Sequence, residues 1–296
     1  MIHDAMNEKL FAALQYITPQ HSLSRAAGWL ANQRTEWIKN RFIEWFIERY
    51  GVDMSEALEE NPRAYRCFNE FFTRALKPDA RPIDTTEGSI VCPADGSVSQ
   101  LGRIEEGRIF QAKGQMYTTR ELLGGSEALA AEFDQGHFAT IYLSPKDYHR
   151  VHMPYEGQLR TTVAVPGELF SVNNATARQV PRLFSRNERL VTIFDTDLGP
   201  MAVVLVGAMI VAGIETVWGG EVAPIRRKVQ TLDFRPKSPI TLNKGEEMGR
   251  FKLGSTAIVL FGRNKVNWES AFQAGSPTWM GQKLGVRQST TDHQKP

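Results

Sequence analysis

The sequence predicts an α+β protein, with a mostly β core of mixed or antiparallel sheets, barrel- or sandwich-like, preceded by amphipathic helices. Apolar residues recur at helical spacing within residues 1–75. From residue 76 onward, short apolar runs separated by glycines take over, and few helical patterns interrupt them. Because strands without intervening helices do not form a βαβ series, we expect a helical region, residues 1–75, and a β-rich domain, residues 76–296.

The first region carries three amphipathic stripes. They lie at residues 10–17, 23–30 and 37–46 and predict two or three helices. Trp29, Trp37 and Trp45 share this region with several arginines and lysines, a composition typical of helices that lie in the headgroup layer of a membrane. A helical cap packed on the core would show the same spacing, so both interpretations stay open.

The composition excludes several classes of protein. The chain has 296 residues, 42% of them hydrophobic, which suits one large globular domain or two modest ones. A formal net charge of +2 argues against a nucleic-acid partner. The two cysteines, Cys67 and Cys92, form no CxxC pair and no Cys/His cluster, so we expect neither a zinc site nor a disulfide framework.

We expect neither a secretory signal nor a membrane-spanning segment. Residues 1–18 contain Asp4, Glu8 and Lys9 and lack a sustained apolar stretch. The longest apolar run, residues 201–214, is shorter than the roughly 20 residues that span a bilayer, and glycines interrupt it. This run therefore predicts buried strands, in a chain that stays on the cytoplasmic side.

A loop rich in proline at residues 78–82 precedes the segments with strand character. These segments are residues 89–92, 97–104, 138–143, 158–165, 190–195, 201–206, 211–217 and 256–261. Residues 119–133 favour a helix by propensity. Residues 287–296 are polar and predict a loose tail.

Three short motifs carry candidate chemistry. Asp95 stands in a Pro-Ala-Asp-Gly turn, from which its carboxylate can point into a cleft. His149 and His152 are three residues apart, so they would share one face of a helical turn but point apart on an extended chain. Ser255 follows Gly254, whose lack of a side chain leaves its carbonyl open to the serine hydroxyl. A tight turn, a loop and the entrance of a buried strand are the structural alternatives.

Asp95, His152 and Ser255 together supply an acid, an imidazole and a hydroxyl. Such a set lets the histidine take the serine proton while the carboxylate orients the imidazole. A serine hydrolase would use the set in an intact chain, but the sequence LGSTA around Ser255 lacks the GxSxG elbow. A non-catalytic membrane-binding module would leave these side chains without a chemical role. A metal pair at His149 and His152 has no third ligand nearby in the sequence, so we expect no metal.

The motifs resemble those of the phosphatidylserine decarboxylase family. The resemblance rests on PADGSV, LSPKDYHRVHMP and FKLGSTAIVLFG in this order, and extends to FNEFFTRALKPDARPI and FSVNN, covering most of residues 68–262. It implies a proenzyme, or zymogen, that cuts itself between Gly254 and Ser255. The two products, a β chain of residues 1–254 and an α chain of residues 255–296, would stay associated.

The resemblance also implies how individual residues act. Asp95, His152 and Ser255 would form the self-cleavage triad, and Ser255 would become a pyruvoyl group, the cofactor of the enzyme. The amine of phosphatidylserine would form a Schiff base with the pyruvoyl carbonyl, lose carbon dioxide and leave as phosphatidylethanolamine. His149 would contact the headgroup or move the proton.

The implied substrate is a bilayer lipid, so we expect a peripheral lyase of phospholipid biosynthesis on the cytoplasmic face of the cell membrane. The helices of residues 1–75 would lie on the membrane surface, with Phe71, Phe72 and the three tryptophans near lipid or at the rim of the cleft. A pyruvoyl decarboxylase of a soluble amino acid is the nearest alternative, although it would not need basic, aromatic helices. A monomer and a homodimer both stay open.

Overall fold

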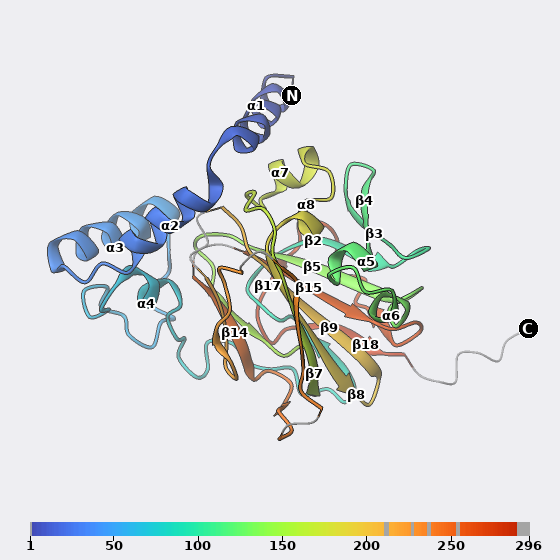
Figure 1. Ribbon diagram of the computed structural model, residues 1–296. Coiled ribbons are helices and arrows are strands. Elements are labelled where there is room, and N and C mark those ends of the chain that lie inside the picture. Colours follow the sequence, from blue (N-terminus) through green and yellow to red (C-terminus); the bar gives the residue numbers. More distant parts are fainter. Residues whose placement is uncertain (1, 210–212, 226–227, 236–237, 253–254, 289–296) are drawn as a thin grey trace, which may run out of the picture.

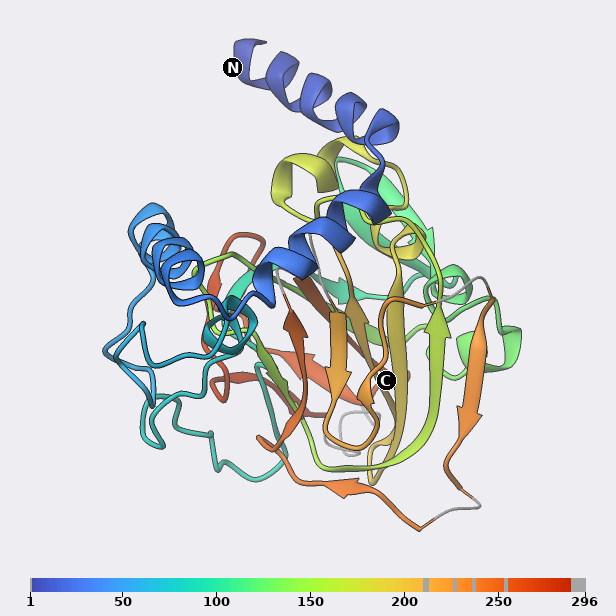
Figure 2. The same cartoon turned by 60° about the vertical axis from the view of Figure 1, so that its left-hand side comes forward.

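Four helices begin the chain in the computed structural model, which describes residues 2–209, 213–225, 228–235, 238–252 and 255–288. They are α1 (Ile2–Ile17), α2 (Gln20–Ala31), α3 (Glu36–Tyr50) and α4 (Phe68–Phe72). The predicted N-terminal helices are therefore confirmed. Helices α1, α2 and α3 lie outside the β core in both views (Figure 1 and Figure 2). The boundary expected between residues 75 and 76 stays a prediction.

An antiparallel sheet of nine strands forms the centre of the β-rich part. Its order is β12-β7-β8-β9-β15-β5-β2-β17, with β13 also paired to β7. The bounds are β2 (Gly96–Arg103), β5 (His137–Leu143), β7 (Gly157–Val165), β8 (Arg189–Thr196), β9 (Gly199–Val206), β12 (Gln230–Asp233), β13 (Thr241–Leu242), β15 (Ser255–Phe261) and β17 (Pro277–Thr278). The described strands run from β12 to β17 without closing into a barrel, so the arrangement is sandwich-like.

Three smaller sheets accompany the central one. The first contains β1 (Ser89–Val91), β18 (Lys283–Arg287) and β16 (Val266–Trp268); the second contains β11 (Gly220–Glu221), β10 (Gly213–Thr216), β14 (Glu247–Lys252) and β6 (Arg150–His152); the third pairs β3 (Arg108–Ala112) with β4 (Gln115–Thr118). Short helices occupy the connections: α5 (Thr119–Leu122), α6 (Glu127–Ala131), α7 (Asn174–Gln179) and α8 (Leu183–Arg186). The predicted α+β class is confirmed.

Strand β15 explains the continuous apolar run of its sequence. It pairs with β5 along one edge and with β9 along the other. Ile258 and Leu260 belong to the hydrophobic core on one face of the sheet, whereas Ala257, Val259 and Phe261 belong to the core on the opposite face. A strand buried on both faces needs apolar residues at nearly every position, so no polar alternation is present.

The helix expected at residues 119–133 is wrong. Helix α5 ends at Leu122 and α6 begins at Glu127, because Gly124 and Gly125 between them adopt φ angles of 84° and 95° that interrupt a helix. Each expected strand has a counterpart with slightly different bounds, although residues 211 and 212 of the expected strand 211–217 lie outside the described residues. Most of the expected C-terminal tail also lies outside them.

Gly96 allows the turn at residues 93–96 to lie directly against strand β5. Its φ angle is 152°, and a Cβ atom at this position would lie 2.1 Å from the carbonyl oxygen of Tyr142. That oxygen belongs to the backbone of a central strand, so it cannot move aside without breaking the sheet. Only glycine permits this approach.

We predict that Gly96→Ala lowers the free energy of unfolding by about 3 kcal/mol, because the methyl group meets backbone and the φ angle disfavours L side chains. Urea denaturation of full-length protein measures this change. Gly102→Ala is the matched control on the same strand, because its Cβ would meet only the ring edge of Phe138, at 3.7 Å. Equal losses in both variants would contradict the prediction.

Candidate active site

Three motifs distant in the sequence meet at one end of strand β5. Ser255, the first residue of β15, pairs with Leu143 at the end of β5. Ser97, just after the Asp95 turn, pairs with Tyr142 from the other edge of β5. Since neighbouring strands lie about 4.8 Å apart, the backbones of β15 and β2 are about 10 Å apart here. The fold therefore gathers the Asp95 turn, the loop after β5 and the start of β15.

The side chain of Ser255 is completely buried, and its hydroxyl has no hydrogen-bond partner among the described residues. A buried polar group without a partner costs free energy, so its presence at this position calls for a functional explanation. The bond expected to be cleaved also involves Gly254, which lies outside the described residues. The position of Ser255 at the mouth of a buried strand agrees with the sequence prediction.

His152 is held as a neutral imidazole. Its Nδ1 lies 2.8 Å from the carbonyl oxygen of Gly245, and its Nε2 lies 3.0 Å from the hydroxyl of Tyr148. A carbonyl only accepts hydrogen bonds, so Nδ1 carries the proton and Nε2 accepts from Tyr148. Burial lowers the pKa of His152 and raises the pKa of Tyr148, which favours the same assignment. Nε2, which carries the lone pair, is therefore the basic atom of this side chain.

His149 occupies a different environment. Its Nδ1 donates to the carbonyl oxygen of Asp147 over 2.8 Å, and its buried Nε2 has no partner among the described residues. The ring packs on Phe72 with the two centroids 3.9 Å apart. Burial lowers the pKa of His149 to about 3, so the imidazole is neutral at pH 7.

The two histidines do not form a metal pair. Residues 150–152 are extended in strand β6, which is the case in which imidazoles three residues apart point in opposite directions. Their contacts agree, because His149 packs on Phe72 whereas His152 bonds Tyr148. Among the described residues, no group of three His, Cys, Asp or Glu side chains could hold a metal ion.

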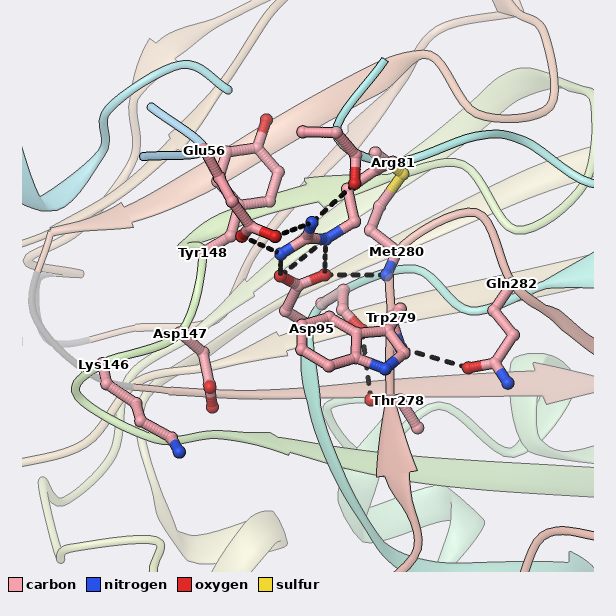
Figure 3. A network of polar contacts seen from close by, with 12 residues as sticks. Glu56, Arg81, Asp95, Lys146, Asp147, Tyr148, Thr278, Trp279, Met280 and Gln282 are labelled. Carbon is pink, nitrogen blue, oxygen red and sulfur yellow. Dashed lines mark hydrogen bonds and ion pairs between the residues drawn. The ribbon is translucent and has the colours of Figure 1, made fainter. Parts of the chain in front are cut away.

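Asp95 is buried and held by an arginine. The Nε and Nη2 atoms of Arg81 donate to its carboxylate over 2.7 to 3.0 Å, and the backbone N–H of Met280 donates to Oδ1 over 2.8 Å. Arg81 also bonds Glu56 through Nη1 and Nη2, and its guanidinium lies 4.7 Å from the ring centroid of Trp279. Figure 3 shows this guanidinium between the two carboxylates.

The structure brings the three predicted residues into one region without linking them directly. Within the described part of the chain, no hydrogen bond joins Asp95 to His152 or His152 to Ser255. The Gly245 carbonyl holds the His152 tautomer, a role expected of Asp95. Burial lowers the pKa of His152, and the charge of Asp95 raises that pKa by a smaller amount. The triad assignment stays a prediction.

Several residues of the site were not predicted from the sequence. Tyr148 and Arg81 lie within the quoted motifs. The available signal for Tyr148 was its place beside two histidines, and the signal for Arg81 was an arginine near an isolated acidic turn. Glu56 and the carbonyl of Gly245 have no such signal. A small cavity of about 150 Å³ lies among Arg81, Asp95 and Tyr148.

Phe71 and Phe72 were expected near lipid or at the rim of the cleft, and the lipid contact is wrong. Both rings are buried, with 0% and 1% of their surface exposed, in the core that α3 and α4 share. Phe68, Phe71 and Phe72 fall within five positions, and the Phe71 and Phe72 rings pack inward on Phe46 and Phe68. Phe72 instead contacts the site through His149.

Comparisons with known proteins agree with the sequence resemblance. A family model described as phosphatidylserine decarboxylase matches residues 68–286, and one described as PSD matches residues 10–51. The phosphatidylserine decarboxylase proenzymes of Pseudomonas putida strain W619 and Pseudomonas entomophila strain L48 are each 62% identical over 283 residues, which cover 95% of this chain and 99% of each relative. That of Pseudomonas fluorescens strain Pf-5 is 61% identical over 283 residues, covering 95% of this chain and 98% of the relative.

We predict that His149 makes the fold lose stability in acid. Its folded pKa of about 3 lies below its unfolded value of 6.5, so protons bind the unfolded chain preferentially between these values. Above pH 6.5 the His149 imidazole is neutral in both the folded and the unfolded chain and has no effect on stability. Below pH 6.5 the free energy of unfolding falls by about 1.4 kcal/mol per pH unit. Urea denaturation at pH 6.5, 5.5 and 5.0 measures the slope.

His149→Asn should lower the slope of unfolding free energy against pH by the equivalent of about one bound proton, whatever its effect on absolute stability. The exposed His21, replaced by asparagine, is the control and should leave the slope unchanged. A slope that His149→Asn does not alter would show that the buried imidazole does not remain neutral in the folded protein.

Proposed function

Because this chain belongs to the phosphatidylserine decarboxylase family and is an enzyme, we propose that it converts phosphatidylserine to phosphatidylethanolamine after cutting itself at Ser255. The self-cleavage proposal rests on the environment of the Ser255 hydroxyl. This hydroxyl is buried and has no partner among the described residues, and it stands opposite Leu143, where the loop with both neutral histidines begins. Nucleophilic attack requires a base that takes the hydroxyl proton, and His152 on this loop is the proposed base.

Self-cleavage starts with attack of Ser255 Oγ on the carbonyl carbon of Gly254. His152 Nε2 takes the hydroxyl proton and returns it to the departing amide nitrogen, so an ester replaces the peptide bond. Removal of the Ser255 α-proton then expels the Gly254 carboxylate and leaves a dehydroalanine. Tautomerisation and hydrolysis by one water release ammonia and leave a pyruvoyl group at the start of the α chain.

The neighbours of His152 support its role as the base. The carbonyl of Gly245 holds the proton on Nδ1 and leaves Nε2 with the lone pair. When Nε2 takes a proton, the charges of Glu247 and, more weakly, Asp95 would stabilise the imidazolium, because both raise the pKa of His152 although burial lowers it more. In this proposal Asp95 acts through its electrostatic field, and the backbone carbonyl orients the ring.

The surroundings of Ser255 fit a pyruvoyl group. The hydroxyl oxygen, which would leave with the Gly254 carboxylate, is buried and makes no hydrogen bond within the described residues, so its loss breaks no contact there. When formed, the group supplies a carbonyl that condenses with the lipid amine and withdraws electrons from the carbon that loses carbon dioxide. His149 is positioned to hold or move a proton at Nε2, because its Nδ1 proton is committed to Asp147.

The α and β chains would stay together after cleavage. Strand β15 of the α chain is bonded on both edges to strands of the β chain, β5 and β9. The α chain also supplies the Met280 N–H that bonds Asp95. Separation would expose the apolar side chains of β15 to water, which opposes dissociation.

The N-terminal helices offer a surface for a membrane. Most of the exposed large apolar side chains of the described residues lie on α1, α2 and α3: Leu10, Phe11, Leu14, Tyr16, Ile17, Leu23, Trp29, Leu30, Trp37, Trp45 and Tyr50. No helix in the described part of the chain is long and apolar enough to cross a bilayer. We propose peripheral attachment through these helices to the cytoplasmic face of the cell membrane.

Ser255→Ala should leave a single chain of 33.3 kDa, because the attacking oxygen is gone. The wild type should give two chains, the smaller one comprising residues 255–296 with a blocked N-terminus. Asp95→Asn and His152→Ala should slow cleavage by about 100-fold or more, whereas His149→Ala should cleave but decarboxylate about 100-fold more slowly. Denaturing intact-mass spectrometry and a carbon dioxide release assay measure these outcomes.

Ser99→Ala, which removes a hydroxyl from strand β2 two residues beyond Ser97, is the control and should cleave like the wild type. Two chains from Ser255→Ala would move the nucleophile to another residue. Cleavage of Asp95→Asn or His152→Ala at the wild-type rate would remove that residue from the machinery.

The double substitution Trp29→Ser and Trp37→Ser should weaken binding to anionic vesicles by about tenfold or more, because it removes two exposed rings from the membrane surface. Vesicle flotation measures binding. Leu232→Ser, which removes an exposed apolar side chain from β12, outside the helices, should leave flotation unchanged. Equal behaviour of the two proteins would indicate that the helices serve another purpose.

A further inference from the structure

A large polar cavity lies between the N-terminal region and the second sheet. Its volume is about 700 Å³, and its walls include Asn69 and Arg74 from the α4 region and Arg150, Arg250 and Lys252 from strands β6 and β14. Neither the proposed self-cleavage nor the membrane surface uses this cavity. The charges in its walls, described next, show what kind of ligand it suits.

Arg74 is a buried cation without a partner carboxylate. Only 4% of its surface is exposed, and its Nε atom has no hydrogen-bond partner among the described residues. Its one hydrogen bond within these residues runs from Nη2 to the carbonyl oxygen of Lys146, over 3.2 Å. Its guanidinium lies 5.5 Å from the ring centroid of Phe71, and the charges of Asp95, Glu56 and Asp147 act on it without a hydrogen bond. An anion bound at Nε would supply the hydrogen-bonded partner that this buried group lacks.

Neighbouring cations reinforce the positive charge. Arg150 and Arg250 both pair with the single carboxylate of Glu247, at 2.8 and 2.6 Å, so two guanidinium groups share one negative charge. Together with Arg74, three arginines on the wall of this cavity face one directly paired carboxylate. Lys252 has its own partners, Glu215 and Glu221, at 3.5 and 3.4 Å. Glu59 and Glu70 also line the cavity, and Glu70 pairs with Arg66 at 2.8 Å, so the lining is mixed and its positive charge centres on Arg74 and the two arginines that share Glu247.

The cavity adjoins the candidate active site. Lys252, in its wall, stands three residues before Ser255, a span of about 10 Å at most. The N–H of Phe251 bonds the carbonyl oxygen of His149, and the charge of Arg74 acts on the His149 imidazole. Arg74 also lines the small cavity beside Asp95 and Tyr148. An anion held at Arg74 would thus lie between the tryptophan-bearing helices and the serine, since Asn32 at the end of α2 is also in the cavity wall.

We propose that Arg74 binds the phosphodiester of the lipid headgroup in this cavity, which places the amine of the substrate toward the start of β15. This assignment rests on the proposed decarboxylase function. A planar guanidinium gives a phosphate two parallel hydrogen bonds and so fixes its orientation. The phosphodiester keeps its charge throughout the reaction, whereas an ion pair to the leaving carboxylate would stabilise the substrate more than the transition state.

Binding of glycerophosphoethanolamine tests the assignment, because this probe has the phosphodiester and lacks both the carboxylate and the acyl chains. Titration calorimetry is done on the full-length Ser255→Ala protein, so that the amine of the probe has no pyruvoyl carbonyl to react with. Adding Arg74→Met should weaken binding by about tenfold or more, while Arg74→Lys should weaken it less. Arg63→Gln is the matched control, because Arg63 pairs with Glu44 on the surface and does not line the cavity, and should change binding by less than about threefold.

Kinetics in the cleaved enzyme provide an independent readout. Arg74→Met should raise KM for phosphatidylserine in mixed micelles by about tenfold and change kcat by less than about threefold. The reason is that the lost contact stabilises the bound substrate and the transition state equally. Intact mass should show normal self-cleavage of this variant. Equal probe binding with and without Arg74, or a loss in kcat alone, would overturn the assignment.

The unaltered cavity gives a test that does not require Arg74 variants to fold. Ser255→Ala protein should bind glycerophosphoethanolamine at least about tenfold more tightly than serine, which carries the carboxylate without a phosphate. Tighter binding of serine would assign Arg74 to the carboxylate and overturn the phosphodiester proposal. Self-cleavage by Ser255→Ala would contradict the proposed function instead, so the two failures are distinguishable.

Discussion

Strand β15 is hydrogen-bonded on both edges and buried on both faces, and this burial constrains everything at its first residue. Ser255 cannot turn toward water, so its hydroxyl must lie unbonded or meet a group that the site provides. The same pairing would hold a newly cut chain end in place. In the proposed mechanism, this one buried strand would hold a desolvated nucleophile before cleavage and fix the position of the cofactor after it.

Arg81 links parts of the chain that would belong to different products of cleavage. It bonds Asp95 and Glu56, and its guanidinium stacks on Trp279, next to the Met280 N–H that also bonds Asp95. A buried carboxylate is tolerated when hydrogen bonds and an opposite charge surround it, and Asp95 has both. The Asp95 carboxylate is consequently held in one position by Arg81 and the Met280 N–H. Arg74, by contrast, makes no hydrogen bond to a carboxylate within the described residues, and this difference from Arg81 is the basis for proposing that it binds a ligand.

The fold was largely predictable from the sequence where one local pattern dominated. The three amphipathic stripes became α1, α2 and α3, and the apolar runs became the central strands. The prediction failed at residues 119–133, where propensity favoured a helix but Gly124 and Gly125 took positive φ angles. It failed again at Phe71 and Phe72, since amphipathic spacing does not reveal whether an aromatic face meets lipid or the protein core.

The sequence was sufficient to identify the family, the buried strand and the residue types able to carry chemistry, because spacing and apolar runs are local properties. The tertiary structure alone decided the partners of those residues. Gly245 bonds His152 across 93 positions of the chain, and Met280 bonds Asp95 across 185. Both contribute backbone groups, which any residue carries, so no side-chain pattern announces them. Folding likewise decided that Arg74 is buried unpaired, since the position of a carboxylate relative to an arginine depends on the packing of distant segments.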